Sequence, residues 1–171
     1  TEFGAVAQLA DEWEKRGTKV MGIFVDGVEE HKKWKGDIET FAGAKAGFPI
    51  IADNDLTVAK AFDMLPADAY MPDGRTPNDS ATVRAVFIIG PDKQLKLSMT
   101  YPMTVGRNFA EVLRALDGLQ TSTGKGVATP ANWNVGDDVI IPATLSDDDA
   151  KAKFGDFNKI LPYLRTTKAP S

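Results

Sequence analysis

The 171-residue sequence contains no cysteine and a single histidine, His31. Without cysteine, these residues can form neither a disulfide nor a thiolate metal site. One histidine also argues against a histidine-based metal centre and against a Ser-His-Asp triad, unless residues outside the chain contribute. We therefore predict no metal site and no cofactor within this sequence.

Long apolar runs and an excess of positive charge are lacking as well. No apolar run approaches the ~20 residues of a membrane span, so no membrane span is predicted. The net charge of −4 and the pI near 5.0 argue against nucleic acid and anionic membranes as partners. The apolar share of 43% is ordinary for a globular protein, and the length suits one domain of ordinary size or one domain with a small appendage.

A helix start is missing too. Apolar residues recur every three or four positions until Gly17, which predicts one helix face: Phe3, Val6, Leu9, Ala10 and Trp13. Residues Thr1–Gly4 resemble the middle of a helix, whose first four N–H groups would otherwise lack partners. We therefore expect the chain to be the larger part of a protein whose N-terminal piece lies outside this sequence.

Apolar runs predict four strands, at residues 19–25, 48–52, 83–89 and 94–101, the last two forming a hairpin around a Gly-Pro-Asp-Lys turn. Helices are predicted at 28–41, 56–64 and 108–119, and a long loop at 66–82. In the helix predicted at 28–41, the candidate core residues are Val28, Trp34, Ile38 and Phe41. Strands alternating with helices favour an α/β fold with one largely parallel sheet and an antiparallel edge.

The pattern of polar and apolar residues changes after Ser122. Residues 121–126 read as a polar linker, followed by short apolar runs at 139–141 and 163–165. Ser146 precedes three aspartates, Asp147–Asp149, and this cluster predicts a capped helix start more simply than a cation site. We predict a main domain over 1–122 and a C-terminal appendage over 123–171 that packs on the main domain or on a second subunit.

Several motifs follow one another in an order that is more specific than any one of them. They are Thr1–Gly4, Asp26–Trp34, Phe48–Asp53, Val83–Asp92, Tyr101–Phe109, Val127–Trp133 and Gly136–Val139. Together they resemble the one-cysteine peroxiredoxins of the peroxiredoxin 6 type, in the AhpC/TSA family. The resemblance covers nearly the whole chain, but the family's peroxidatic cysteine would lie just before Thr1.

The resemblance implies a thioredoxin-like α/β fold with a small C-terminal peroxiredoxin domain. It also implies that N-terminal strands are missing, so that the sheet shows a gap. The implied function is a thiol-dependent peroxidase, an antioxidant oxidoreductase of redox homeostasis that reduces hydrogen peroxide and organic hydroperoxides through a cysteine sulfenic acid. The implied partners are a thiol reductant, such as glutathione or thioredoxin, and a second copy of the chain, in the cytoplasm.

Three residues are candidates for the active site. Arg84 lies in an apolar strand, where a guanidinium is costly unless it meets an anion, although a strand-end arginine reaching solvent is the plain alternative. Arg107 opens a helix, where a cation is mildly unfavourable, and an arginine without a function at such a position is the plain alternative. The resemblance makes both arginines cations of the peroxide pocket and suggests that Glu2 orients one of them. Glu2 could equally be a helix-surface glutamate. We expect both guanidinium groups to converge near Thr1 and Glu2.

The other notable polar residues are interpreted as structural and not as catalytic. His31 and Trp34, three apart on a helix, can touch and are read as structural. Asp92 suits the hairpin turn. Some relatives use an aspartate there, with a serine and a histidine, for lipid hydrolysis, and we leave that activity unassigned.

Two further expectations concern assembly and activity. Strand 94–101 places Leu95, Leu97, Met99 and Tyr101 on one face, and an uncovered edge strand of this kind favours a homodimer. The competing function is a non-catalytic thioredoxin-like interaction module that keeps only the scaffold and the dimer surface.

Overall fold

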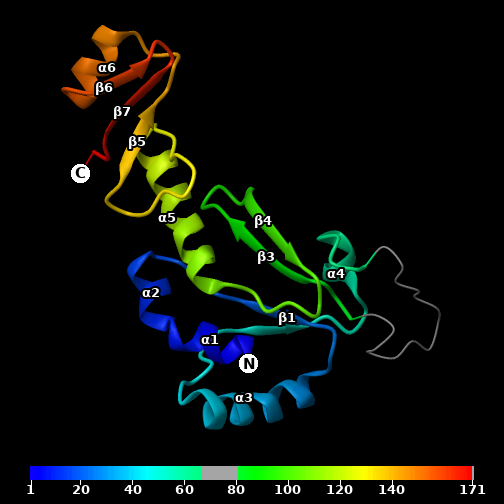
Figure 1. Ribbon diagram of the computed structural model, residues 1–171. Helices are drawn as coiled ribbons and strands as arrows, with labels where there is room; N and C mark the ends of the chain where they lie inside the picture. The colour runs from blue at the N-terminus through cyan, green and yellow to red at the C-terminus, as the bar shows by residue number, and fades with distance from the viewer. Residues whose placement is uncertain (67–80, 171) are drawn as a thin grey trace. The chain divides into compact units, whose positions relative to one another are not determined.

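The computed structural model describes residues 1–66 and 81–170 (Figure 1). The chain forms two compact units, Thr1–Phe109 and Ala110–Ser171. The first holds α1 (Glu2–Gln8), α2 (Ala10–Lys15), β1 (Gly22–Phe24), α3 (Val28–Ala42), β2 (Ile50–Ala52), α4 (Thr57–Ala61), β3 (Arg84–Ile89) and β4 (Leu95–Tyr101). The second holds α5 (Phe109–Lys125) apart from its first residue, and β5 (Asp138–Ile141), α6 (Asp147–Phe154), β6 (Asn158–Leu161) and β7 (Leu164–Lys168). Most of the loop predicted at 66–82 lies outside the described residues.

The predicted first helix is present but broken in two at Leu9. The carbonyl of Val6 accepts the Leu9 N–H at 3.2 Å and the indole Nε1–H of buried Trp13 at 3.1 Å. A three-residue turn tightens the backbone at this point, and the chain resumes as α2. Gly17, at φ +61°, follows α2 with a backbone conformation that favours glycine.

The expected sheet is present as two separate pairs of strands. β1 pairs with β2 in parallel and β3 pairs with β4 antiparallel, and no ladder joins the two pairs among the described residues. The predicted gap is therefore observed. Ile23 of β1 and Phe87 of β3 nevertheless pack against one buried cluster, which consists of Leu56, Ala59 and Met64. Burial alone did not reveal which strand edges pair.

The predicted hairpin is confirmed. The Gly90 N–H donates to the carbonyl of Gln94 at 2.9 Å, and Lys93 takes a positive φ of 61° to close the turn. On β4, residues 97, 99 and 101 are half-buried while 96, 98 and 100 are exposed. This alternation matches the predicted apolar face, apart from exposed Leu95 at its start.

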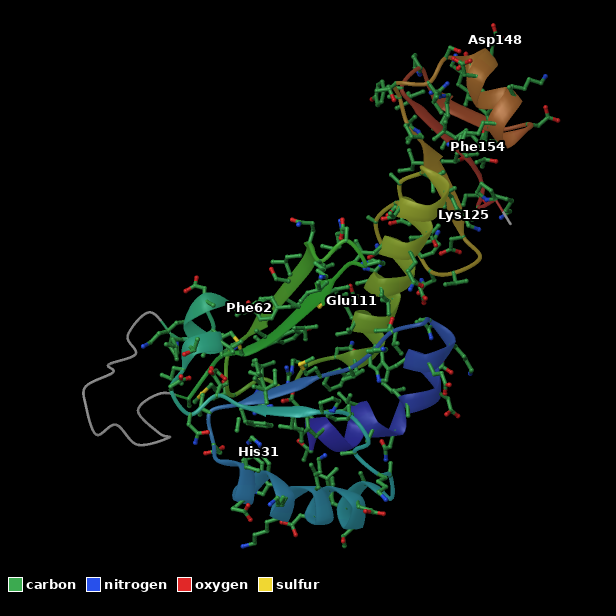
Figure 2. The ribbon with its side chains drawn as sticks, turned by 180° about the vertical axis from the view of Figure 1, so that it is seen from behind. His31, Phe62, Glu111, Lys125, Asp148 and Phe154 are labelled. Atoms are coloured by element: carbon green, nitrogen blue, oxygen red, sulfur yellow. The ribbon has the colours of Figure 1, made fainter. Side chains whose placement is uncertain are left out.

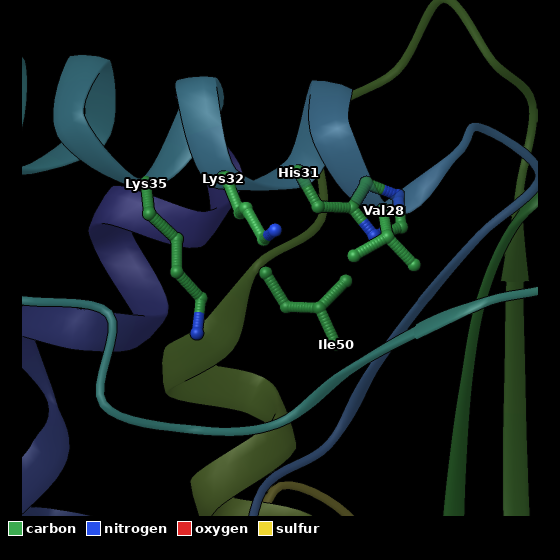
Figure 3. A pocket seen from close by; sticks show the side chains of 5 residues that line it. All are labelled: Val28, His31, Lys32, Lys35 and Ile50. Carbon is green, nitrogen blue, oxygen red and sulfur yellow. The ribbon is translucent and has the colours of Figure 1, made fainter.

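Helix α3 has the predicted position, but three of its four predicted core residues are exposed: Trp34 by 37%, Val28 by 57% and Phe41 by 74%. Ala42 lies so close to Gly4 of α1 that a Cβ added to Gly4 would sit 2.6 Å from the Ala42 Cβ. Because neighbouring helix residues point about 100° apart, Phe41 turns away from that contact. Val28 instead lines a small pocket with His31 (Figure 3). Figure 2 shows His31 near the start of the helix.

The linker predicted at 121–126 is wrong, because α5 continues through Lys125. Ser122 bonds within its own turn, donating its hydroxyl to the Leu119 carbonyl at 3.1 Å. Serine and threonine lower helix stability only by tenths of a kcal/mol each, roughly, so a polar stretch can stay helical. Gly126, at φ +65°, ends the helix.

The second unit is built on an antiparallel sheet of order β5-β7-β6. Its core holds Val127, Trp133 and Val139, and the Trp133 indole donates to the Asp137 carbonyl at 3.2 Å. The predicted capped helix is confirmed as α6, where the Ser146 hydroxyl accepts the Asp149 N–H at 3.0 Å. Over the described residues, no helix is both long and apolar enough to cross a membrane.

Candidate active site

In the described part of the first unit, one carboxylate is held between two guanidinium groups. Glu2 is the first residue of α1, Arg84 the first of β3, and Arg107 lies just before α5. Segments more than 80 residues apart in sequence thus meet, since Glu2 Oε2 lies 2.6 Å from Arg84 Nη1 and Glu2 Oε1 lies 3.0 Å from Arg107 Nε. The predicted convergence of Arg84, Arg107 and Glu2 is present, whereas their catalytic role stays a prediction.

Arg84 is held at two points and remains partly open to solvent. Its Nε–H donates to the Met103 carbonyl at 2.7 Å, and Nη1 pairs with Glu2. Its second terminal nitrogen, Nη2, has no hydrogen bond to any residue of 1–66 or 81–170. With 34% of its side chain exposed, Arg84 presents fixed positive charge at the surface of the site.

Arg107 is held more tightly and is only 18% exposed. Its Nε and Nη2 bind the two Glu2 oxygens at 3.0 and 3.1 Å, its backbone N–H binds Glu2 Oε1 at 2.8 Å, and its Nη1 donates to the Ala85 carbonyl at 2.7 Å. The guanidinium also lies 5.6 Å from the centroid of the Phe109 ring. This geometry is the bidentate fork that lysine could not reproduce.

The two arginines keep Glu2 ionised. Burial disfavours its charged form, but hydrogen bonds from the Arg107 side chain and backbone, with the charges of Arg107 and Arg84, outweigh that effect and lower the pKa of Glu2. One negative and two positive charges leave a net positive site. Such a site can stabilise a thiolate or the oxygen that gains charge when an O–O bond breaks.

Two contacts at this site have no signal in the sequence. The carbonyls of Met103 and Ala85 fix Arg84 and Arg107 respectively. Because every residue has a backbone carbonyl, no side-chain pattern could have marked these two.

The other polar candidates lie outside this cluster. The rings of His31 and Trp34 contact each other, with centroids 6.2 Å apart, and His31 also contacts Phe24 at 5.8 Å. Asp92 accepts the Gln94 N–H at 3.1 Å within the hairpin turn, as its plain interpretation predicts.

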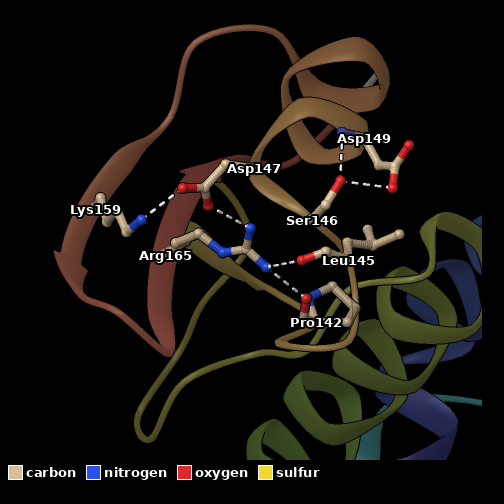
Figure 4. Close-up of polar contacts among 7 residues, drawn as sticks. All are labelled: Pro142, Leu145, Ser146, Asp147, Asp149, Lys159 and Arg165. Carbon is tan, nitrogen blue, oxygen red and sulfur yellow. Dashed lines mark hydrogen bonds and ion pairs between the residues drawn. The ribbon is translucent and has the colours of Figure 1, made fainter.

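The aspartates at the start of α6 serve the second unit. Asp147 binds Arg165 Nη1 at 2.8 Å and Lys159 Nζ at 2.5 Å, while Asp149 bonds to the Ser146 hydroxyl at 2.6 Å (Figure 4). Arg165 is 2% exposed and also donates to the carbonyls of Pro142 and Leu145. These contacts join α6 to the β6–β7 hairpin.

Comparisons with known proteins agree over nearly the whole chain. The AhpC/TSA family matches residues 1–98, and the C-terminal domain of 1-Cys peroxiredoxin matches residues 118–156. The chain is 50% identical to the mitochondrial peroxiredoxin PRX1 of Saccharomyces cerevisiae, with 99% of this chain and 64% of that protein covered. It is 46% identical to peroxiredoxin-6 of Gallus gallus, covering 99% of this chain and 79% of that protein. The chain thus spans less than two thirds of the yeast protein.

Solved structures show the same fold. A yeast mitochondrial 1-Cys peroxiredoxin, studied for thiol resolution through the glutathione and thioredoxin systems, superposes with a TM-score of 0.87 at 49% identity, covering 98% of this chain and 78% of that one. A cysteine-to-serine variant of peroxiredoxin 6 from Arenicola marina gives 0.88 at 43% identity, covering 99% and 78%. The thioredoxin-like fold prediction is confirmed by these superpositions.

Proposed function

Because this chain belongs to the AhpC/TSA family of peroxiredoxins, in its 1-Cys branch, we propose that it is the larger part of a thiol peroxidase. The substrates would be hydrogen peroxide and organic hydroperoxides. The observation that carries the proposal is the pair of arginines, Arg84 and Arg107, held by Glu2 at the start of α1. The nucleophile would be a cysteine preceding Thr1 in the longer protein, since this chain has none.

The proposed step needs both cations. The cysteine thiolate attacks one peroxide oxygen, an S–O bond forms, and the O–O bond breaks. The cysteine becomes a sulfenic acid, and the departing oxygen takes its electron pair and a proton to leave as water or an alcohol. Arg84, partly exposed, would favour the thiolate and stabilise the departing oxygen, while Arg107 positions Glu2 and through it Arg84.

Peroxide consumption with dithiothreitol as reductant tests this function. We expect no activity from the 171-residue chain, activity from a version extended through the cysteine, and about a 100-fold loss in the extended Arg84→Ala variant. Arg16→Ala is the matched control, because Arg16 also pairs with a glutamate of the same unit, at 2.7 Å from Glu12. Equal turnover by the cysteine-free chain would refute the mechanism, and full activity in Arg84→Ala would refute the role of Arg84.

The same assay distinguishes the proposed peroxidase from the competing function. A non-catalytic interaction module would keep the fold and the arginine pair but show no turnover even when extended. The observation that favours this alternative is the absence of cysteine from the 171 residues. Intact-mass analysis of the natural protein decides directly, because a longer species bearing cysteine supports the peroxidase.

The assembly is proposed as a homodimer, with a main domain over 1–122 and a dimerisation appendage over 123–171. The alternating face of β4 supports it, as do exposed Ile160, Leu161 and Tyr163 around the turn between β6 and β7. Light scattering at micromolar concentration should give twice the monomer mass. A monomer alone would contradict the proposal.

The reductant and the compartment complete the proposal. Glutathione or thioredoxin would reduce the sulfenic acid, as suggested by the yeast structure studied with those systems. We propose a cytoplasmic location. The competing location is the mitochondrion, because the yeast relative is mitochondrial. Cell fractionation with an antibody to the chain distinguishes the two.

A further inference from the structure

A small pocket beside the first half of α3 belongs to none of the chemistry above. Its volume is about 140 Å³, and its lining consists of Val28, His31, Lys32 and Lys35 of α3 and Ile50 of β2. The four α3 residues are spaced by three, one and three, so they share one helix face. Figure 3 shows Lys32 and Lys35 extending from the helix toward Ile50, while Val28 lies beside the His31 ring. The contact between Gly4 and Ala42 lies at the opposite end of α3.

The charges around this pocket are mostly positive. Lys32 pairs with Glu29 at 2.7 Å, whereas Lys35 has no ion pair or hydrogen bond within the described residues. His31 is 5% exposed, and its Nε2 has no hydrogen-bond partner among residues 1–66 and 81–170. A buried imidazole nitrogen without a partner is uncommon, because burial removes its water. Within the part of the chain that the structure describes, the pocket is therefore lined by the unpaired ammonium of Lys35, the Lys32 ammonium that pairs with Glu29, and the unpartnered imidazole nitrogen of His31.

The rest of the lining is apolar. Val28 and Ile50 offer methyl groups, and Val28 is 57% exposed although it is aliphatic. A cavity of about 140 Å³ takes roughly five water-sized groups, which is the size of a short-chain organic acid. Cationic groups beside aliphatic groups complement a molecule with an anionic end and a short hydrocarbon end.

We propose that this pocket binds a small monocarboxylate with a short aliphatic chain. The carboxylate pairs with Lys35 and Lys32 and accepts a hydrogen bond from His31, and the hydrocarbon end packs on Val28 and Ile50. An inorganic anion would leave the apolar surface exposed, and an uncharged alcohol would leave Lys35 unpaired. Affinity in the millimolar range is expected for so small a ligand.

Nuclear magnetic resonance of the histidine ring tests this directly. The extended protein is labelled with ¹³C-histidine, the His31 signal is identified by its loss in His31→Gln, and butyrate is added at constant pH and ionic strength. We expect a saturable shift of the His31 signal with butyrate. Butanol and butylammonium should give no saturable shift, and chloride at the same concentration should give less than butyrate. Equal shifts with butyrate and butylammonium, or a shift that never saturates, would overturn the proposal.

A matched pair of lysine variants gives a second test that does not disturb buried residues. Lys35→Gln removes a charge that lines the pocket, and Lys33→Gln removes an exposed charge of the same helix that does not. We expect Lys35→Gln to weaken butyrate binding about fourfold and Lys33→Gln to change it little. Equal weakening in both variants would show a general charge effect and would refute a site at this pocket. Isothermal titration with butyrate measures both, independently of the histidine signal.

Discussion

The side chain of Glu2 joins α1, β3 and the segment before α5, so its replacement should affect stability beyond its own helix. In Glu2→Gln the shape is retained, but two guanidinium groups lose their counter-charge. Glu2 is 17% exposed and receives contacts from Arg84 Nη1 and from three nitrogens of Arg107. Hydrogen bonds to charged groups contribute about 1.5–3 kcal/mol each but are not additive, and glutamine keeps one acceptor oxygen. We expect a loss of about 2 kcal/mol in the free energy of unfolding.

The pH dependence separates charge from packing. Because the folded state lowers the pKa of Glu2, its stabilising contribution is fully present above the unfolded pKa, about 4.3, and is lost as the pH falls through the folded value. The stability gap between the wild type and Glu2→Gln should therefore be largest at neutral pH and should shrink at acid pH.

Urea unfolding at neutral pH and at acid pH measures this gap. Glu14→Gln is the control, since Glu14 is an exposed glutamate in the neighbouring helix α2. A gap in Glu2→Gln that is as large at acid pH as at neutral pH would refute the electrostatic argument. A Glu14→Gln variant that loses as much stability would show that the Glu2 bridge has no special role.

Three other substitutions test the packing. Trp133→Ala, at a site 2% exposed, should cost about 3–5 kcal/mol of unfolding free energy, measured by urea titration followed by circular dichroism. Ser146→Ala removes the α6 cap and should cost about 1 kcal/mol in the same titration. Gly4→Ala would place a Cβ 2.6 Å from the Ala42 Cβ and should cost about 1–3 kcal/mol, seen as a lower Tm by calorimetry. Unchanged stability in any of the three would contradict the contact named for it.

Local sequence signals predicted most elements of this fold. The Gly-Pro-Asp-Lys turn between two apolar runs was enough for the β3–β4 hairpin, and Ser146 before three aspartates was enough for α6. The gap in the sheet was implied by the resemblance alone, because apolar runs report burial and do not report which strand edges pair. The end of α5 is predicted too early, because a polar stretch is taken as irregular structure, although residues 121–125 are helical.

The candidate site depended more on resemblance than on residue patterns. The residues alone left Arg84 and Arg107 with plain alternatives, and Glu2 was as easily a surface glutamate. The structure shows the three joined by contacts between 2.6 and 3.1 Å, which link positions 2, 84 and 107. Such long-range pairing has no local signal, and the backbone carbonyls that complete it have no signal of any kind.

The break between the β1–β2 and β3–β4 pairs has a consequence for handling the purified chain. Each pair is only two strands wide in the described residues, so open strand edges are available as templates on which other copies can stack and aggregate. At neutral pH the net charge of −4 opposes such stacking by repulsion between molecules. That repulsion vanishes near pH 5.0, the isoelectric point, and is screened by salt. Concentrated solutions should therefore stay clear at neutral pH and low salt, and their turbidity should rise as the pH is brought toward 5.0.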